Sequence, residues 1–207
     1  MKSLMRCLAI AWLLLLVAPT PSGASGPGDL QSIRPEVLAR ALRAFERVEA
    51  AGRVRNRLLT VIDYALPSSR RRLWVLEPGS REILFQEFVA HGKGSAPEDD
   101  PDRAVRFGNQ VGSFRSSLGT FLTGDAYLGE HGYSLRLEGL ESGVNDRAAE
   151  RAIVIHPADY VGKAFRLRSG GRLGRSWGCP ALDPEIAPQI IDRIQAGSVI
   201  FADGAGS

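Results

Sequence analysis

The feature that most constrains the fold is a series of short apolar segments between residues 58 and 201, separated by turn residues. The segments are rich in β-branched and aromatic side chains, which is typical of strands. Glycine, proline and serine interrupt them, which is typical of turns. The expected strands cover residues 58–66, 73–76, 83–90, 119–123, 133–140, 152–156 and 198–201. The sequence therefore predicts a β-rich α+β fold, more sandwich-like than doubly wound.

Two segments show helical periodicity, one at each end of this strand-rich region. In the first, Pro35 suits an opening helical position and Gly52 a stop, and apolar residues recur every three or four positions between them. In the second, Asp183 and Pro184 form a capping pair before a row of isoleucines. Pro188 fits poorly inside a helix, so the regular part is expected to start there. We expect an N-terminal helix packed against the domain and a short C-terminal helix.

The N-terminus has the features of a secretory leader. Lys2 and Arg6 precede an apolar stretch, Leu8–Val17, that is too short to span a bilayer comfortably. Small residues follow, and Ala24 is a suitable cleavage position. The sequence predicts a signal peptide over residues 1–24 and export to the periplasm or cell envelope, with no stable membrane anchor after cleavage. An uncleaved anchor is the alternative.

The rest of the chain is interpreted as a linker and helix over residues 25–57 and one domain over residues 58–203, a length that suits a single core. The chain has 26 basic and 23 acidic residues. Loss of a leader with two basic and no acidic residues lowers its net charge from +3 to +1. So small a charge does not favour nucleic acid as a partner. The run Arg70–Arg72 is expected to be a solvated turn.

Cys179 is the only cysteine that remains once a leader containing Cys7 is removed. It therefore has no partner for an internal disulfide, which leaves an intermolecular disulfide, an inert buried thiol or a reactive nucleophile. A thiol attacks carbonyls as the thiolate, so it needs a base or a positive neighbour. His156 ends the β-branched strand expected over residues 152–156, where a rigid element would hold its imidazole. Together, His156 and Cys179 predict a base carried by a strand and a nucleophile carried by a loop.

The backbone around the thiol narrows this chemistry. Pro180 has no N–H, so an oxyanion would have to be bound by amides of Cys179 and of Gly178 or Trp177. Pro180 also favours an extended conformation at Cys179, so the thiol gains no helix dipole and its activation would depend on His156.

The remaining histidines do not predict a metal site. His91 and His131 lie in glycine-containing turns and are interpreted as structural or solvated. None of the histidine and cysteine spacings is a close pair of the kind that binds zinc. The sequence therefore predicts neither a metal nor another cofactor.

Small motifs occur in a fixed order between residues 58 and 201. They are Gly112-Ser113, Ser116-Ser117-Leu118-Gly119, Tyr127, Gly129, His131-Gly132-Tyr133-Ser134-Leu135, Gly139-Leu140-Glu141, Asn145-Asp146, Arg151, Ile153-Val154-Ile155-His156, Gly171-Arg172-Leu173-Gly174-Arg175-Ser176 and Gly178-Cys179-Pro180-Ala181-Leu182. This series resembles the murein L,D-transpeptidase catalytic domain family. The ordered series is much more specific than any single motif. It implies a β-sandwich domain and a peptidoglycan substrate.

The resemblance also implies roles for individual residues. Cys179 is expected to be the nucleophile and His156 its partner, with Ser176 and Gly178 shaping the pocket. The chain departs from the commoner signature of this family in two places: Trp177 stands where a histidine is usual, and Pro180 follows the cysteine. The chain therefore resembles a divergent branch.

Two functions follow from this reading. The first is an exported cysteine acyltransferase that acts on peptidoglycan stem peptides, by L,D-transpeptidation or L,D-carboxypeptidase activity. Charged stems need polar anchors, and Arg175 and Arg172 are candidates for binding a stem carboxylate. The second is a non-catalytic wall-binding module on the same fold, favoured if Trp177 fills the pocket. A different thiol hydrolase or peptidase is a third reading.

Overall fold

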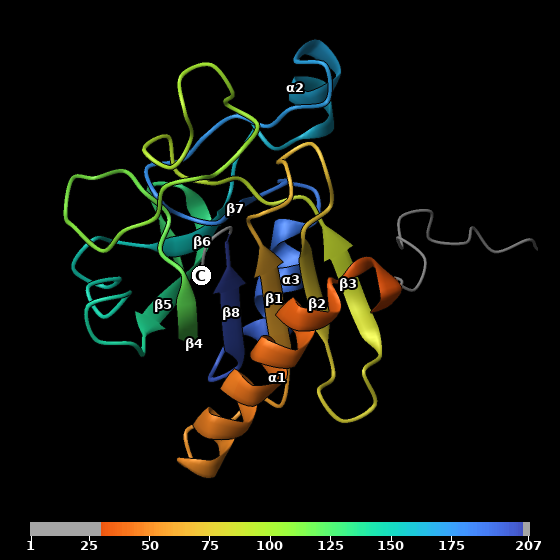
Figure 1. Ribbon diagram of the computed structural model, residues 1–207, viewed down its shortest axis with the longest axis vertical. Helices are drawn as coiled ribbons and strands as arrows, with labels where there is room; N and C mark the ends of the chain where they lie inside the picture. The colour runs from red at the N-terminus through yellow and green to blue at the C-terminus, as the bar shows by residue number, and fades with distance from the viewer. Residues whose placement is uncertain (1–29, 205–207) are drawn as a thin grey trace, which may run out of the picture.

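Eight strands form one mixed sheet in the computed structural model, which describes residues 30–204. The strand order is β3-β2-β1-β8-β4-β5-β6-β7, and the sheet curls so that both of its halves contribute to one core (Figure 1). β1 runs parallel to β8, and β6 runs parallel to β7. The strands are β1 (Leu59–Asp63), β2 (Leu73–Leu76), β3 (Ile83–Glu87), β4 (Gly119–Gly129), β5 (Gly132–Gly139), β6 (Val154–Pro157), β7 (Ala181–Leu182) and β8 (Val199–Asp203). The helices are a 3-10 turn (Leu30–Ser32), α1 (Pro35–Ala50), α2 (Lys163–Arg168) and α3 (Ala187–Ile194).

The central strands are buried on both faces because a helix covers each side. Side chains alternate along a strand, so Leu59 and Val61 of β1 pack on the α1 side together with Val199 of β8. Ile62 and Ile200 belong to the opposite core, which contains the isoleucines of α3. This double burial explains why these strands read as continuous apolar runs in the sequence.

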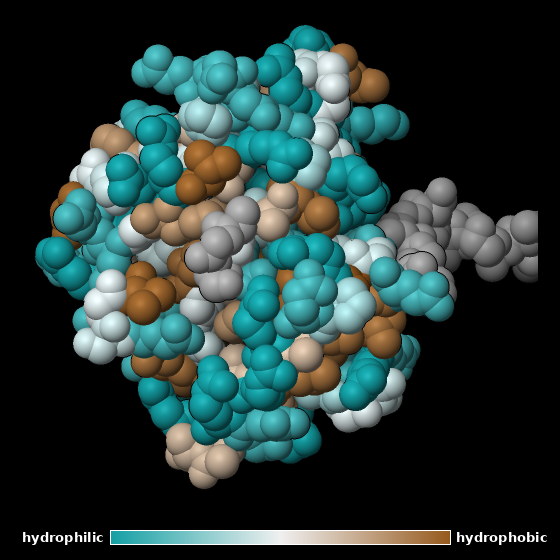
Figure 2. Space-filling view, viewed as in Figure 1, coloured by the Kyte–Doolittle hydropathy of each residue, from teal (hydrophilic) through white to brown (hydrophobic). Residues whose placement is uncertain are grey.

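α1 packs one apolar stripe onto the sheet. Val37, Ala41, Phe45 and Val48 recur at helical spacing and are buried. The outer face of the helix is mostly hydrophilic, as the space-filling view shows (Figure 2). Pro35 opens the helix, where its missing N–H leaves no intrahelical bond unmade. The sequence pattern and the observed packing therefore agree along the whole helix.

Two buried carboxylates lie side by side at the ends of the central parallel strands, because the register pairs Asp63 of β1 with Asp203 of β8. Like charges this close repel each other unless cations compensate them. Arg34 donates to the two carboxylate oxygens of Asp63 at 2.7 and 2.9 Å. Arg40 donates to Asp203 at 2.7 Å. These ion pairs join α1 and its N-terminal flank to the two central strands.

The predicted fold class is confirmed: a β-rich α+β fold with an N-terminal helix and a short C-terminal helix. The sequence did not predict α2 or β7, because segments of six and two residues are too short to show a periodicity. β4 continues past the expected 119–123 to Gly129 through a shift in its register with β5. α3 starts at Ala187, one residue before the proline that was expected to open it.

The predicted leader lies outside this structure. Residues 1–24 and the first part of the linker are not among the described residues. Within residues 30–204, no helix has both the length and the apolar character needed to cross a membrane. The leader, its cleavage and the domain boundaries stay predictions.

The expectation of a solvated turn at Arg70–Arg72 is wrong for Arg72. Its side chain is fully buried and donates to the carbonyls of Leu66 at 2.6 Å and Val89 at 3.0 Å. It also donates to Nδ1 of His91 at 2.7 Å. His91 is buried as well, and its desolvation, together with the nearby Arg72 charge, lowers its pKa to about 3. A run of three arginines has no periodicity that could show which side chain turns inward.

Candidate active site

The parallel pair of β6 and β7 joins two segments that are far apart in the sequence. Its register sets His156 beside Ala181, and Cys179 comes two residues before Ala181. β6 also pairs with β5, so the imidazole stands on a strand inside the sheet. The fold therefore brings the strand that carries the predicted base next to the loop that carries the thiol.

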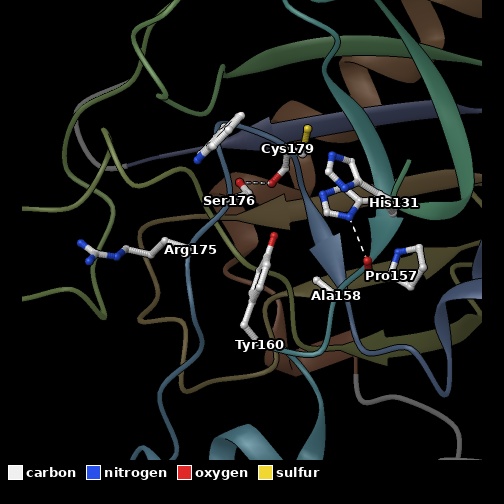
Figure 3. Close-up of a pocket in the computed structure, with 9 residues that line it drawn as sticks. His131, Pro157, Ala158, Tyr160, Arg175, Ser176 and Cys179 are labelled. Carbon is white, nitrogen blue, oxygen red and sulfur yellow. Dashed lines mark hydrogen bonds between the residues drawn. The ribbon is translucent and has the colours of Figure 1, made fainter. Parts of the chain in front are cut away.

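A cavity of about 290 Å³ opens where these segments meet. Its lining residues are His131, His156, Pro157, Ala158, Tyr160, Arg175, Ser176, Trp177 and Cys179. The Tyr160 hydroxyl points toward Ser176, whereas the Arg175 guanidinium extends away from the sulfur of Cys179 (Figure 3). The thiol and the imidazole thus share one cavity that could hold the backbone of a peptide.

Ser176 organises the loop that carries the thiol. Its backbone N–H donates to His91 O at 3.0 Å, and its carbonyl accepts from Lys93 N at 2.8 Å, which aligns the loop with the segment after β3. Its hydroxyl donates to Cys179 O at 2.6 Å and accepts from Gly178 N at 3.1 Å. One serine therefore fixes the loop both internally and against its neighbour.

Gly178 holds a backbone conformation that other residues rarely adopt, with φ of +126°. A Cβ at this position would lie 2.8 Å from Arg115 O, closer than real Cβ contacts allow. The carbonyl of Gly178 accepts from Ser116 Oγ at 3.1 Å, and its N–H is already engaged by Ser176. Of the three amides expected to bind an oxyanion, those of Trp177 and Cys179 therefore remain candidates.

Cys179 is 8% exposed, and burial raises the pKa of its thiol. The backbone N–H of Val154 and the charge of Arg151 oppose this by lowering the same pKa. Arg151 is held in place by Gly108 O at 2.8 Å and Ser117 Oγ at 2.5 Å. Burial is the largest of these effects, so the pKa of Cys179 lies above its ordinary value of 9.0 and the resting group is the neutral thiol.

His156 is oriented by its neighbour in the chain. Its Nδ1 lies 2.9 Å from Pro157 O, and because a carbonyl only accepts, Nδ1 carries the hydrogen. Nε2 then has a free lone pair, as a base requires. Burial lowers the pKa of His156, so the imidazole is neutral near pH 7. His131 stacks on it with the ring centroids 4.5 Å apart.

The sequence profile of the L,D-transpeptidase catalytic domain matches residues 29–202. The chain belongs to this family. Among solved structures, it is similar to an L,D-transpeptidase from Mycobacterium smegmatis, with 17% identity, a TM-score of 0.42, and 71% of this chain and 58% of that chain covered. It is also similar to the helical cell shape determining protein Pgp2 (K307A mutant) from Campylobacter jejuni, with 13% identity, a TM-score of 0.44, and 83% and 56% covered. The chain thus spans less than two thirds of each of these chains. No curated protein sequence matches it.

Most of the predicted site residues lie together. Cys179, His156, Ser176, Trp177 and Arg175 line the cavity, and Gly178 is buried beside them. Arg172 is exposed and does not line the cavity. Its Nε donates instead to Ser169 O at 3.2 Å.

Sequence reasoning missed two cavity residues that carry ionisable side chains. His131 was interpreted as structural or solvated, and it stacks on His156 at the cavity wall. Tyr160 gave no signal, yet it lines the cavity, and burial raises its pKa to about 12. Only the sheet brings either residue near the thiol. Within the described part of the chain, no cluster of histidine, cysteine, aspartate and glutamate is arranged to hold a metal.

Proposed function

We propose that this protein is a cysteine-dependent acyltransferase that acts on peptidoglycan stem peptides. The observation that carries the proposal is the shared cavity: a thiol and a neutral imidazole line it, and the imidazole presents a free Nε2. Membership of the L,D-transpeptidase catalytic domain family supports the substrate class. The predicted leader supports export to the periplasm or cell envelope, where such a substrate lies.

The first step transfers an acyl group to the enzyme. Nε2 of His156 removes the thiol proton as Sγ of Cys179 attacks the carbonyl of the L-centre diamino acid in a tetrapeptide stem. The resulting oxyanion is bound by backbone amides of Trp177 and Cys179. The C–N bond then breaks, His156 returns the proton to the leaving amine, and the terminal D-amino acid departs. A thioester on Cys179 remains.

The second step resolves this thioester. An amine of a neighbouring stem attacks the thioester carbonyl, with His156 accepting its proton, and the reformed thiol leaves. The product is a cross-link. If water attacks instead, the product is a shortened stem, and the protein acts as an L,D-carboxypeptidase. Both outcomes use the same thiol and imidazole, so they are two fates of one intermediate.

Neutral resting groups suit this mechanism. Burial raises the pKa of the Cys179 thiol and lowers that of His156, so the resting pair is a neutral thiol and a neutral imidazole. Arg151 favours the negative sulfur as it forms. Arg175 at the rim and Arg172 farther along the loop are proposed to anchor stem carboxylates, because both are exposed cations on the loop that leads to the thiol.

The decisive test is intact-protein mass spectrometry after incubation with a disaccharide-free tetrapeptide. The wild-type protein should gain the mass of the stem minus its terminal D-amino acid, and peptide mapping should locate this mass on Cys179. A Cys179→Ala protein should show no adduct and no product. Ser169→Ala is a matched control on the same loop, outside the cavity lining, and should form the adduct normally.

The wall-binding module is the competing outcome. Trp177 does not fill the cavity, since the space remains open with Trp177 in its wall. If the Cys179→Ala protein still processed stems, the acyl-enzyme mechanism would be wrong. If the wild type bound stems without forming any adduct, the protein would be a binding module.

A further inference from the structure

An exposed aromatic pair with a lysine beside it stands at the rim of the cavity. Trp177 is 70% exposed and Phe114 is 36% exposed, and their ring centroids are 5.5 Å apart at an interplanar angle of 55°. Nζ of Lys93 lies 4.3 Å from the Phe114 ring centroid and 5.5 Å from that of Trp177. We call these three residues the rim platform. So much exposed aromatic surface beside a cavity is typical of a binding surface.

The rim platform is fixed in place by its backbone. Phe114 has a φ of +54°, a strained conformation for a bulky residue, and its carbonyl accepts from Gly94 N at 2.9 Å. A Cβ on Gly92 would lie 2.2 Å from Phe114 O and 2.8 Å from the Cα of Gly178. Gly92 therefore lies against both the segment that carries Phe114 and the loop that carries the thiol. Ser116 Oγ joins the two directly by donating to Gly178 O at 3.1 Å.

The charge at the rim is positive. Arg175 lines the same cavity as Trp177. Among residues 30–204, no carboxylate forms an ion pair with Lys93 or with Arg175. Lys93 also presents its ammonium over the aromatic faces. A ligand for this surface would combine an apolar flat face with a negative group close to it.

We propose that the rim platform is a subsite for a sugar ring of the glycan strand, so that the protein recognises stem peptides that are still attached to sugar. The inference rests on the proposed function. The C–H face of a pyranose stacks on an exposed aromatic ring, while a carboxylate of the attached stem faces Lys93 and Arg175. A free stem peptide has the carboxylate but lacks a rigid flat face for Trp177.

Binding in a protein that cannot turn over substrate tests this inference. Cys179→Ala protein, produced without residues 1–24, has two tryptophans, and Trp74 is fully buried. Fluorescence during titration therefore reports mainly on Trp177. A disaccharide-tetrapeptide should bind about tenfold more tightly than the free tetrapeptide and should change the emission.

Four variants in this background separate the rim platform from other causes. Trp177→Leu and Phe114→Leu should each reduce the preference for the disaccharide ligand to about onefold, measured by calorimetry because Trp177→Leu loses the fluorophore. Trp177→Tyr should restore most of the preference. Leu167→Ala, at an apolar residue that is 76% exposed on α2, is the matched control and should keep it. Trp74 emission checks that each variant is folded.

The outcomes are distinct from those of the proposed function. Equal affinity for both ligands in the Cys179→Ala protein, or an unchanged preference in the Trp177→Leu variant, would overturn the sugar subsite. Concentration-dependent dimerisation that Trp177→Leu abolishes would also overturn it, because the surface would then bind a second copy. A sugar preference without any thioester in the wild type would instead contradict the acyltransferase and leave the subsite standing.

Discussion

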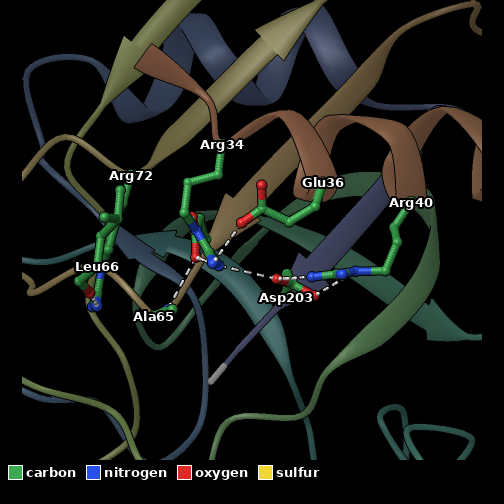
Figure 4. A network of polar contacts seen from close by, with 8 residues as sticks. Arg34, Glu36, Arg40, Ala65, Leu66, Arg72 and Asp203 are labelled. Atoms are coloured by element: carbon green, nitrogen blue, oxygen red, sulfur yellow. Dashed lines mark hydrogen bonds and ion pairs between the residues drawn. The ribbon is translucent and has the colours of Figure 1, made fainter. Parts of the chain in front are cut away.

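Arginines are neutralised by carboxylates in one region of the molecule and left without carboxylate partners in another. Between α1 and the sheet, Arg34 and Arg40 meet the carboxylates of Asp63 and Asp203 (Figure 4). Immediately before β2, the fully buried Arg72 is held by the carbonyls of Leu66 and Val89 and by the ring nitrogen of His91.

Arg151 follows the pattern of Arg72. It is held by the Gly108 carbonyl and the Ser117 hydroxyl, and in the described part of the chain neither Arg72 nor Arg151 forms an ion pair. Carbonyl dipoles satisfy a guanidinium without cancelling its charge. The α1 region therefore uses charge for attachment, whereas the site retains positive charge next to a sulfur that must become negative.

The largest effect expected in the site concerns the base. His156→Gln should lower kcat/KM for tetrapeptide stems by about 10²- to 10⁴-fold, because the thiol then has no group to accept its proton. His131→Gln, which alters the neighbouring ring and keeps the base, should lose much less. Steady-state kinetics measure both. Equal losses in the two variants would contradict the assignment of the base.

The pH dependence of activity also tests whether His156 is the base. Burial lowers the pKa of His156 below its ordinary value of 6.5, and a base must be deprotonated to act. Activity should therefore rise with pH through an acidic limb centred below 6.5. A limb above 6.5 would mean that the base is better solvated than this cavity allows.

Loss of the buried Arg72 cation should cost more stability than loss of an ion pair at α1. Arg72→Met leaves the acceptors on Leu66, Val89 and His91 buried without donors, which should lower the free energy of unfolding by about 3 kcal/mol. Urea denaturation measures the change. Little change would show that methionine packing offsets the lost hydrogen bonds.

The matched substitution in the α1 region is Asp63→Asn. Arg34 is about one third exposed, so water can solvate its charge when the carboxylate is lost. We expect a smaller decrease in the free energy of unfolding, about 1 kcal/mol, with activity on stems retained. A larger loss here than in Arg72→Met would reverse the comparison between the two regions.

The smallest effect should come from Arg151. Arg151→Gln removes the charge that favours the thiolate, so the pKa of Cys179 should rise further, and alkylation by iodoacetamide near pH 8 should slow by less than about tenfold. Arg147→Gln is the control, because Arg147 pairs with Glu150 at the surface. Equal alkylation rates in the two variants would show that the charge of Arg151 does not lower the pKa of Cys179.

Local patterns predicted the elements well wherever one face or both faces of an element are buried. The stripe on α1 and the apolar runs of β1, β2 and β8 are direct consequences of the faces they bury. The same logic failed for α2 and β7, which are too short to show a period. It also failed for Arg72, because a charged side chain turns inward only when the fold supplies acceptors at the right places.

The sequence by itself determined the fold class, and it singled out one cysteine and one histidine through composition and strand pattern. Only the tertiary structure decided that these two side chains line one cavity, that Nδ1 of His156 is committed to Pro157 O, and that His131, Tyr160 and Phe114 stand near the site. The physical reason is that sequence patterns are local, whereas the contacts that form a site join residues far apart in the chain. Periodicity records which face of a segment is buried, whereas a site depends on which distant segments the sheet places side by side.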